Sequence, residues 1–380
     1  MDTSWWKTKE ELDDVQKEFI LLPAAGRIVL EGPPGSGKTN LLLLRAQFIA
    51  GQGEKNVLVL TYTKTLSEFM RRGVAAKGII SGDQVKTYHS WANEHIKQYL
   101  GEWLVQDGAD FNDETRVKAV EMLKKANQKI PTNKLYQAIF VDEAQDFTLE
   151  ELECLLYLSD KICICGDLKQ GIYQRDGLAI AEKMGLQKYA LKNHYRIGHR
   201  IAQVADKLMP PSAGEESLEA TSNYNAKLYG ASSAKMHECD SRVEQFAKMR
   251  EFLSVQLDAF KGDSIGILCG KRDTVAEVVE FFKGTEFEKY LASAVDGFGG
   301  ERVIHVMTMH SAKGLEFRAV HMFGVEELKH HPLNRTKLAY TTVTRAKTAL
   351  NAYRSGSTRP ALEAAFAEPK HIELDDIFPG

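Results

Sequence analysis

The chain has 380 residues and a formal net charge of −3, and 43% of its residues are hydrophobic and 27% charged. This length accommodates two domains of ordinary size, and the composition is that of a soluble globular protein. The apolar runs are too short for a membrane span, no secretory signal opens the chain, and its five cysteines fit a reducing compartment. We therefore expect a cytoplasmic protein without a membrane partner.

The first half of the chain repeats one pattern, in which an apolar run leads through a polar loop into a helix-forming segment. The runs are RIVLE, NVLVLT, QAIFV and KICIC, at residues 27–31, 56–61, 137–141 and 161–165. Each is followed by such a segment, the last two being 144–159 and 168–173. Continuous apolar strands that alternate with helices are typical of a parallel sheet covered on both faces. The pattern stops near an expected exposed loop at 210–225. It resumes at 263–270 and 302–310, where the segment after the strand is 311–317, so the sequence predicts an α/β fold with two such domains.

The segment GPPGSGKT follows the first apolar run and opens a helix, which is the context that a phosphate-binding loop requires. Its glycines let backbone N–H groups point inward at an anion. The lysine can reach the terminal phosphates and the threonine hydroxyl can hold Mg²⁺. The predicted ATP-binding residues of this loop are Gly32, Pro33, Pro34, Gly35, Ser36, Gly37, Lys38 and Thr39.

The segment VDEAQD ends another apolar run with two adjacent acids. We expect Asp142 to reach Mg²⁺, directly or through water, and Glu143 to polarise the attacking water. Together with the phosphate loop, these acids predict hydrolysis of a nucleoside triphosphate with Mg²⁺ as cofactor.

The segment GDLKQGIYQRDG, residues 166–177, combines two kinds of side chain in one short loop. Asp167 and Gln170 stand at the end of an apolar run, where a γ-phosphate could be sensed. Tyr173 and Arg175 follow at once and offer flat groups that can stack on a base.

Five further segments follow an order typical of one family: TYTKTLSEF, TYHSW, NHYR, MTMHSAKGLEF and LAYTTVTRAK. With the three segments above, they resemble the motifs of superfamily 1 helicases of the UvrD/Rep type, over roughly residues 12–350. The resemblance implies two RecA-like P-loop domains with ATP in the cleft between them and single-stranded nucleic acid across both.

The resemblance also implies the division of the chain. We expect an N-terminal domain at 1–190, a C-terminal domain at 191–360 and an acidic tail at 361–380. A small helical insertion is expected at about 98–138, whereas family members carry a large insertion in each domain. Because those insertions engage duplex DNA, translocation follows more directly from the resemblance than unwinding does.

Roles of single residues follow from the resemblance by position. Gln16 is expected to read the adenine edge, Tyr195 to stack on the adenine and Glu316 to bond the ribose. Gln170 is expected to sense the γ-phosphate, and Arg196 and Arg345 to act as arginine fingers, which suits the charge that phosphoryl transfer places on this group. The expected DNA contacts are Thr61, Tyr62, His89, Tyr173, Arg175 and His310.

Three positions depart from the family pattern. Arg175 and Asp176 stand where the family has a tryptophan and then an arginine, so a guanidinium replaces an indole at a base-stacking position. Asn40 follows the phosphate-loop threonine, where the family usually has arginine.

The function predicted from these motifs is an ATP-dependent single-stranded DNA translocase and helicase, moving 3′ to 5′, with tailed duplex as a further substrate. The alternative is a DNA-stimulated regulatory ATPase subunit of a nuclease or defence complex, without processive unwinding. A small-molecule kinase would not require HSAKGLEF or a second arginine-bearing domain. The final segment HIELDDIFPG is either an electrostatic shield or a docking peptide for a protein partner.

Overall fold

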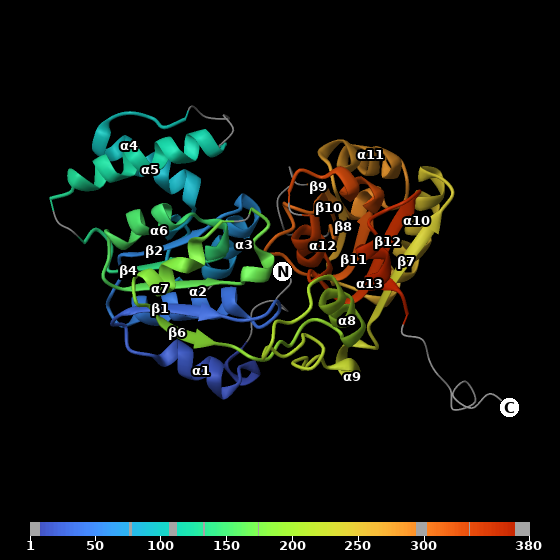
Figure 1. Cartoon of the computed structure of the whole chain (residues 1–380), viewed down its shortest axis with the longest axis horizontal. Coiled ribbons are helices and arrows are strands. Elements are labelled where there is room, and N and C mark those ends of the chain that lie inside the picture. Colours follow the sequence, from blue (N-terminus) through green and yellow to red (C-terminus); the bar gives the residue numbers. More distant parts are fainter. Residues whose placement is uncertain are drawn as a thin grey trace.

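The computed structural model describes residues 8–75, 78–105, 112–131, 134–173, 175–293, 302–333 and 335–368. It contains two six-stranded sheets, which lie in two lobes side by side (Figure 1). The strands are β1 Arg27–Glu31, β2 Val57–Thr61, β3 Val85–Thr87, β4 Ala138–Val141, β5 Ile162–Gly166, β6 Gln187–Ala190, β7 Ser233–Cys239, β8 Ile265–Cys269, β9 Leu291–Ser293, β10 Ile304–Thr308, β11 Phe317–Phe323 and β12 Ala346–Ser355.

Helices of very different lengths connect these strands. The α-helices are α1 Asp14–Leu21, α2 Lys38–Gly51, α3 Lys64–Ala75, α4 Tyr88–Leu100, α5 Asp113–Gln128, α6 Leu149–Leu156, α7 Ile180–Lys183, α8 His199–Leu208, α9 Ala226–Tyr229, α10 Arg242–Ala259, α11 Arg272–Phe282, α12 Arg335–Val343 and α13 Pro360–Phe366. The 3₁₀ turns are η1 Lys9–Glu11, η2 Gly82–Gln84, η3 Ala144–Asp146, η4 Leu168–Gln170, η5 Gly177–Ala179, η6 Glu288–Tyr290 and η7 Val325–His330.

The first sheet has the strand order β3-β2-β4-β5-β1-β6, and all of its neighbours pair in parallel. Alternate residues of its strands feed two apolar cores, because side chains along a strand point to opposite faces. The core on one face contains residues of α1, α2 and α3, and the core on the other contains residues of α4, α5 and α6. The sheet is therefore buried on both faces, as its continuous apolar runs predict.

The second sheet has the order β7-β12-β11-β8-β10-β9 and is also parallel throughout. Helices α8, α12 and α13 pack on one face, and α10 and α11 on the other. The predicted α/β class with two RecA-like domains is confirmed. Because the carboxyl ends of parallel strands share one edge, loops that are distant in sequence meet there.

The helices α4 and α5 pack against each other, and α5 also contacts α6 (Figure 1). The N-terminal part of α4 lies in the segment TYHSW, and α5 falls within the expected insertion at 98–138. The exact bounds of an insertion stay a prediction.

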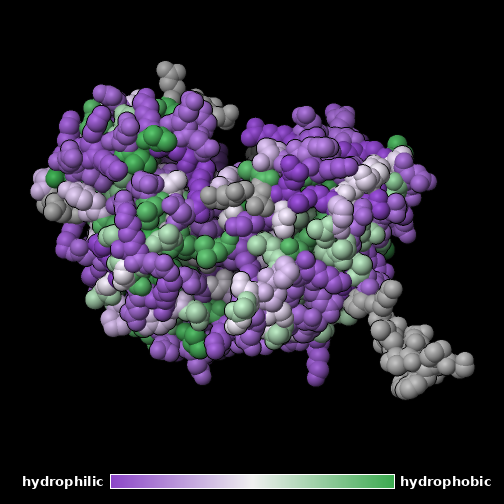
Figure 2. All heavy atoms as spheres, in the orientation of Figure 1, coloured by the Kyte–Doolittle hydropathy of each residue, from purple (hydrophilic) through white to green (hydrophobic). Residues whose placement is uncertain are grey.

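The two lobes are joined by contacts as well as by the chain. Helix α12 of the second lobe contacts η4 of the first. Ile172, from the loop after β5, belongs to the apolar core formed mainly by α8, α12 and α13. Figure 2 shows a largely hydrophilic surface on this side, with a hollow between the lobes at its upper edge.

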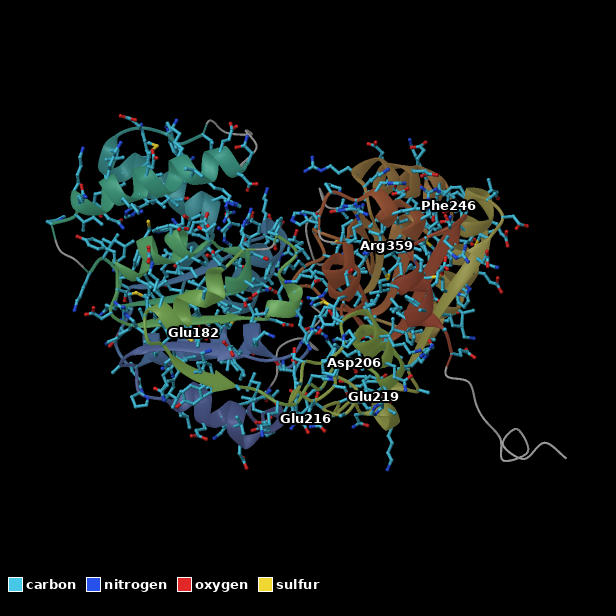
Figure 3. The ribbon with its side chains drawn as sticks, in the orientation of Figure 1. Glu182, Asp206, Glu216, Glu219, Phe246 and Arg359 are labelled. Carbon is cyan, nitrogen blue, oxygen red and sulfur yellow. The ribbon has the colours of Figure 1, made fainter. Side chains whose placement is uncertain are left out.

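The segment 210–225 is anchored rather than loosely attached. Asp206 on α8 accepts the backbone N–H groups of Leu218 and Glu219, at 2.9 and 3.0 Å (Figure 3). The ring of buried His194 is 2.6 Å from the Leu218 carbonyl oxygen. This loop is thereby fixed beside the segment NHYR.

Some predicted elements differ from the structure. After β5 the chain forms the short turn η4, and after β10 it forms turns instead of a helix, so the segments 168–173 and 311–317 are mainly turns and loops. The predicted start of the acidic tail at residue 361 is too early. Leu362, Ala365 and Phe366 of α13 are buried in a core of the second lobe. Strands β6 and β7 had no clear sequence signal, since Gln187–Ala190 and Ser233–Cys239 are mixed in polarity.

No helix in the described ranges is long and apolar enough to cross a membrane. The segment HIELDDIFPG lies outside the described residues.

Candidate ATP site and nucleic-acid interface

The phosphate loop connects β1 to α2 at the carboxyl edge of the first sheet. Gly35 and Gly37 have φ values of +78° and +88°, in a region that favours glycine. The Lys38 ammonium folds over the loop and donates to the carbonyl oxygens of Gly32 and Pro33, at 2.7 and 3.0 Å. The loop thus has the tight turn predicted for an anion cradle at the N-terminus of α2.

The residues predicted to hold adenine lie together beside this loop. Gln16 is buried, and its side-chain amide donates to the Ser36 carbonyl oxygen at 3.0 Å. Its own backbone N–H is capped by Asp13 at 2.7 Å, and the Tyr195 hydroxyl donates to the same carboxylate. The backbone N–H of Tyr195 also donates to the Gly35 carbonyl oxygen at 3.2 Å.

The Mg²⁺ candidates are in direct contact. The Thr39 hydroxyl donates to a carboxylate oxygen of Asp142 at 2.8 Å, and the Cys165 thiol lies 2.8 Å from the other oxygen. Burial raises the pKa of Asp142 to about 6, and the neighbouring Glu143 adds to this effect. A hydroxyl and a carboxylate are hard oxygen ligands of the kind that Mg²⁺ prefers.

Glu143 has an unusual backbone. Its φ of +54° places it in the left-handed region, where among the described residues it is the sole non-glycine. Burial alone would raise its pKa, but the cations Lys313, Arg345 and Lys38 hold the pKa of Glu143 below the ordinary value. The Gln145 amide also donates to its carboxylate. A strained, ionised carboxylate between three cations is a feature of functional sites.

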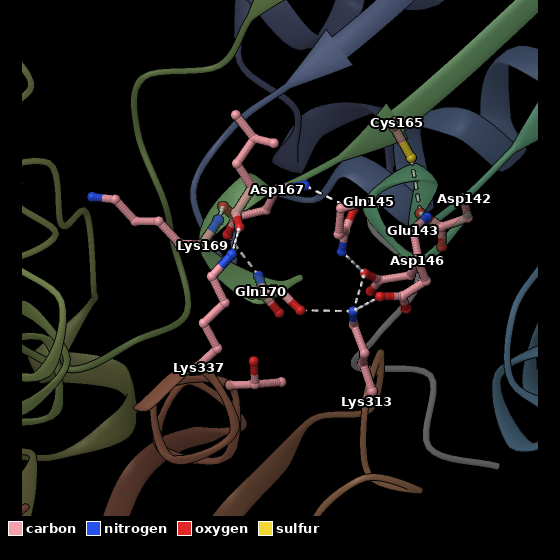
Figure 4. A network of polar contacts seen from close by, with 12 residues as sticks. Asp142, Glu143, Gln145, Asp146, Cys165, Asp167, Lys169, Gln170, Lys313 and Lys337 are labelled. Carbon is pink, nitrogen blue, oxygen red and sulfur yellow. Dashed lines mark hydrogen bonds and ion pairs between the residues drawn. The ribbon is translucent and has the colours of Figure 1, made fainter. Parts of the chain in front are cut away.

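Lys313, from the second lobe, contacts this site in the first lobe (Figure 4). Its ammonium is 2.6 Å from Asp146, 3.7 Å from Glu143 and 2.8 Å from the Gln170 carbonyl oxygen. Burial raises the pKa of Asp146 to about 6, although Lys313 opposes this.

Arg345 makes a second bridge between the lobes. Its guanidinium donates to the side-chain oxygen of Gln170 and is oriented by the carbonyl oxygens of Thr341 and Leu315, at 3.0 and 3.2 Å. Burial lowers its pKa, but the nearby carboxylate of Glu143 opposes that effect. Gln170, Arg345 and Glu143 therefore converge.

Arg196 lies beside the phosphate loop. The Cβ of Arg196 occupies the space next to the Gly35 Cα, because a Cβ added at Gly35 would lie 3.1 Å from it. The Arg196 guanidinium pairs with Glu316 and donates to the Thr344 carbonyl oxygen at 2.9 Å. Burial, with Arg345 as a further cause, holds its pKa well below the ordinary value. Glu316, predicted to bond ribose, is thus engaged with an arginine.

The predicted nucleic-acid residues form a second group at the interface. We define the aromatic cluster as Tyr62, His89, Tyr173 and His310. The Tyr62 ring is 5.0 Å from His89 and 5.1 Å from Tyr173, whose ring is 5.4 Å from His310. All four side chains are half-buried and come from both lobes. Burial lowers the pKa of His89 to about 3 and of His310 to about 4, so both rings are neutral at pH 7.

Two arginines surround the cluster. Arg175 lies over the Tyr173 ring at 4.6 Å, and Arg116 of α5 lies over the Tyr62 ring at 5.3 Å. Both donate to the Tyr62 hydroxyl, at 3.1 and 2.8 Å. Arg116 is also paired with buried Glu151. The chain thus places two cations beside the rings where its resemblance predicts bases.

The remaining predicted positions have mainly structural contacts. Thr61 is fully buried at the end of β2. Asn40 is also buried, in the first turn of α2. Asp176, which stands where the family has an arginine, accepts the Leu149 backbone N–H at the start of α6 at 3.1 Å.

Sequence reasoning gave no role to several residues of these sites. Lys313 lies inside the motif HSAKGLEF, and this motif could have indicated a role for it. No motif contains Arg116, which is one of many charged residues in a predicted helix. Arg45 is buried and donates to backbone carbonyls in the last turn of α1 and just after it, which fastens the helix of Gln16 to α2.

The described residues contain no group of three or more His, Cys, Asp or Glu side chains arranged to hold a metal ion.

Comparisons with known proteins agree with this arrangement of two domains. Residues 16–176 match the family model described as an AAA domain, and residues 303–353 match that of the UvrD-like helicase C-terminal domain. No curated protein matches the chain. A solved structure described as "The structure of PRRSV helicase" is similar with 16% sequence identity and a TM-score of 0.41, over 90% of this chain and 54% of that chain. This chain therefore spans about half the length of that protein.

The fold and the phosphate loop define a P-loop NTPase with two RecA-like domains. The two matched segments contain the phosphate loop, Glu143, Gln170, Lys313 and Arg345, whereas Tyr195 and Arg196 lie between them. These matches support the assignment of the chain as a UvrD-like, ATP-hydrolysing helicase of superfamily 1.

Proposed function

We propose that this chain is an ATP-dependent single-stranded DNA translocase and helicase that moves 3′ to 5′. The observation that carries the proposal is the contact of Arg345 in the second lobe with Gln170 in the first, beside Glu143. An ATP site built from both lobes couples hydrolysis to their relative movement. The 3′ to 5′ direction rests on the family resemblance alone.

In this proposal the nucleotide lies along the carboxyl edge of the first sheet. Backbone N–H groups of the phosphate loop and Lys38 bind the phosphates, and Lys38 exchanges its carbonyl contacts for them. Gln16 and Tyr195 hold the adenine. Glu316 reaches the ribose only if it leaves Arg196, which then turns to the phosphates.

Thr39 and Asp142 fit Mg²⁺ and would hold it, since each offers a hard oxygen and they already contact each other. The ion, when bound with ATP, neutralises phosphate charge. Asp142 is oriented for this by the Cys165 thiol on the neighbouring strand β5.

Glu143 orients and polarises the water that attacks the γ-phosphate. Its lowered pKa keeps it ionised at neutral pH, so it can accept a proton from that water. Arg345 and Arg196 supply fixed donors for the charge that develops on the transferred group. Gln170 links Arg345 to the loop that continues to Tyr173, and this loop relates the nucleotide state to the aromatic cluster.

Single-stranded DNA is proposed to bind at the aromatic cluster, with bases on Tyr62 and Tyr173. Stacking on aromatic rings is tolerant of sequence, as a translocase requires. His89 and His310 contribute as neutral rings, and Arg175 contributes a cation. A cytoplasmic location, tailed duplex as substrate and a protein partner of the acidic tail remain parts of the proposal that rest on the sequence.

A second function is favoured by one observation. Arg175 replaces the family's tryptophan, and its guanidinium is engaged by Tyr62 and Asp146 within the protein. A weaker grip on bases suits a regulatory ATPase that senses DNA in a nuclease or defence complex without processive unwinding.

Strand displacement separates the two functions. The helicase should displace a labelled strand from duplex with a 3′ tail, and not from duplex with a 5′ tail, only with ATP and Mg²⁺. ATP hydrolysis stimulated by single-stranded DNA without displacement of either substrate would favour the regulatory ATPase. Displacement from the 5′-tailed duplex alone would contradict the proposed direction.

A further inference from the structure

Arg175 has three acceptors, and they differ in exposure. It donates to the Tyr62 hydroxyl at 3.1 Å and to the Asp146 carbonyl oxygen at 2.9 Å, both within the interface. Its third partner is the Asp113 carboxylate at 3.1 Å, in the first turn of α5. The Arg175 side chain is 13% exposed and that of Asp113 is 91% exposed.

This difference makes Asp113 the partner that is most easily exchanged. A carboxylate in water gains little from an ion pair, because solvent and salt screen the attraction. The two inner acceptors, in contrast, hold the Arg175 side chain in place. One side of the guanidinium is therefore fixed, and among the described residues its acceptor on the other side is a solvated acid.

The side of the Arg175 guanidinium that Asp113 covers is part of the candidate nucleic-acid site. The Arg175 guanidinium lies 4.6 Å from the Tyr173 ring centroid and 5.5 Å from that of Tyr62. A nucleotide whose base stacks on either ring brings a phosphodiester close to this group. A guanidinium presents a planar fork of donors that matches phosphate as well as carboxylate.

We propose that Asp113 occupies the phosphate-binding side of Arg175 in the free protein, and that a phosphodiester of a single strand displaces it. The inference rests on the proposed function, because it assumes that nucleic acid binds at the aromatic cluster. It adds an internal competitor, carried by α5, that lowers the affinity for the strand.

The exchange involves the side chain of Asp113 and leaves α5 docked. One turn further along the helix, Arg116 pairs with buried Glu151 and donates to the Tyr62 hydroxyl at 2.8 Å. Both ends of this ion pair are almost unexposed, at 4% and 0%, so the pair holds the helix while Asp113 turns to water.

The chain offers a matched control in the next residue. Asp113 and Glu114 are both exposed acids in the first turn of α5. Asp113→Asn and Glu114→Gln each remove one negative charge from the same helix N-terminus, where acids are similarly favourable. Only the first change removes an Arg175 partner.

The test is the affinity for a fluorescent oligothymidylate, measured by anisotropy over a range of salt concentrations. We expect Asp113→Asn to bind about threefold to fivefold more tightly than the parent at low salt, with a gain that shrinks as salt rises. Glu114→Gln should stay within about 1.5-fold of the parent, since its charge is further from the strand.

A double-mutant cycle makes the result specific to Arg175. In the Arg175→Gln background, Asp113→Asn should give no gain. An equal gain from Glu114→Gln, or a gain that persists without Arg175, would overturn the inference while leaving the proposed function intact. A parent protein that binds no oligothymidylate would contradict both.

Discussion

The Lys313 ammonium lies 2.6 Å from a carboxylate oxygen of Asp146, and both side chains are almost completely buried. The same ammonium donates to the Gln170 carbonyl oxygen at 2.8 Å, so one side chain of the second lobe holds two loops of the first. One of these loops contains Glu143, and the other continues to Tyr173. We therefore expect a movement of the second lobe to displace the loop of Glu143 and the aromatic cluster together.

Replacing Lys313 should damage this connection. Lys313→Met leaves the Asp146 carboxylate buried without its cation, which costs about 3–5 kcal/mol for a buried pair. We expect a lower free energy of unfolding in urea, and ATP hydrolysis that single-stranded DNA no longer stimulates. Lys329→Met removes an exposed lysine of η7 and should change stability by no more than about 0.5 kcal/mol. Full DNA stimulation in Lys313→Met would show that the contact is not used.

Glu143→Gln should separate nucleotide binding from hydrolysis. The amide keeps the shape of the side chain but cannot accept a proton, so turnover should fall by about two or more orders of magnitude. ATP binding, measured with a fluorescent analogue, should be retained. Glu150→Gln alters an exposed acid of α6 and should have parental turnover. Lys38→Ala, in contrast, should lose nucleotide binding or hydrolysis.

Arg345 tests whether the site spans both lobes. Arg345→Ala should bind ATP and hydrolyse it as slowly as Glu143→Gln, because the developing phosphate charge loses a donor from the second lobe. Arg345→Lys should be similarly slow, since an ammonium cannot reproduce the fork that contacts Gln170, Thr341 and Leu315. Single-turnover hydrolysis measures the chemical step, and a parental rate in Arg345→Ala would place the site in one lobe.

Arg116 and Glu151 form a buried ion pair, so the effect of replacing Arg116 on stability should depend on whether Glu151 is still charged. Arg116→Met leaves Glu151 uncompensated and should lower the free energy of unfolding by about 3–5 kcal/mol. The double variant Arg116→Met/Glu151→Leu removes both charges and should recover part of this loss. A double variant that is less stable than Arg116→Met would contradict the proposed balance of charges.

Acid should destabilise the protein through buried histidines. Burial lowers the pKa of four imidazoles to about 3 or 4, against about 6.5 in an unfolded chain. Between pH 6.5 and pH 4 the unfolded chain thus binds more protons, so the free energy of unfolding falls as pH falls. Asp142 and Asp146, with pKa raised to about 6, act in the opposite direction below that pH. The histidines are His89, His194, His310 and His321.

Among the described residues, histidines whose pKa is lowered by burial outnumber carboxyls whose pKa is raised by burial, so a net loss of stability from pH 7 to pH 5 is expected. Urea unfolding at pH 7, 6 and 5 measures it. Constant or rising stability toward pH 5 would show that these imidazoles are not held neutral in the folded state.

The sequence predicted the parts of the fold that short-range patterns encode. Apolar runs and the phosphate-loop motif gave the parallel sheets and the position of Lys38, because strand burial and loop chemistry are local properties. The order of the motifs predicted that Gln170 and Arg345 would meet, although the two residues are far apart in the chain. The mixed strands β6 and β7 and the buried helix α13 had no comparable signal, since tertiary packing decides their burial.

The contacts of charged side chains were beyond sequence reasoning. A guanidinium at position 175 can stack on a base or bond to the protein, and the sequence does not say which. The answer depends on where α5 lies, because Asp113 reaches Arg175 only through the docking of that helix. The contact of Arg116 with Tyr62 also depends on the position of α5, which the sequence does not show.

The central claim is that ATP is hydrolysed at a site shared by both lobes and that single-stranded nucleic acid stimulates this hydrolysis. The steady-state rate of phosphate release, measured with and without saturating single-stranded DNA, tests it most directly. We predict a rate that rises on adding DNA in the parent chain and stays at background in Lys38→Ala and Arg345→Ala. A parental rate that is unchanged by DNA, or full activity of Arg345→Ala, would contradict the claim.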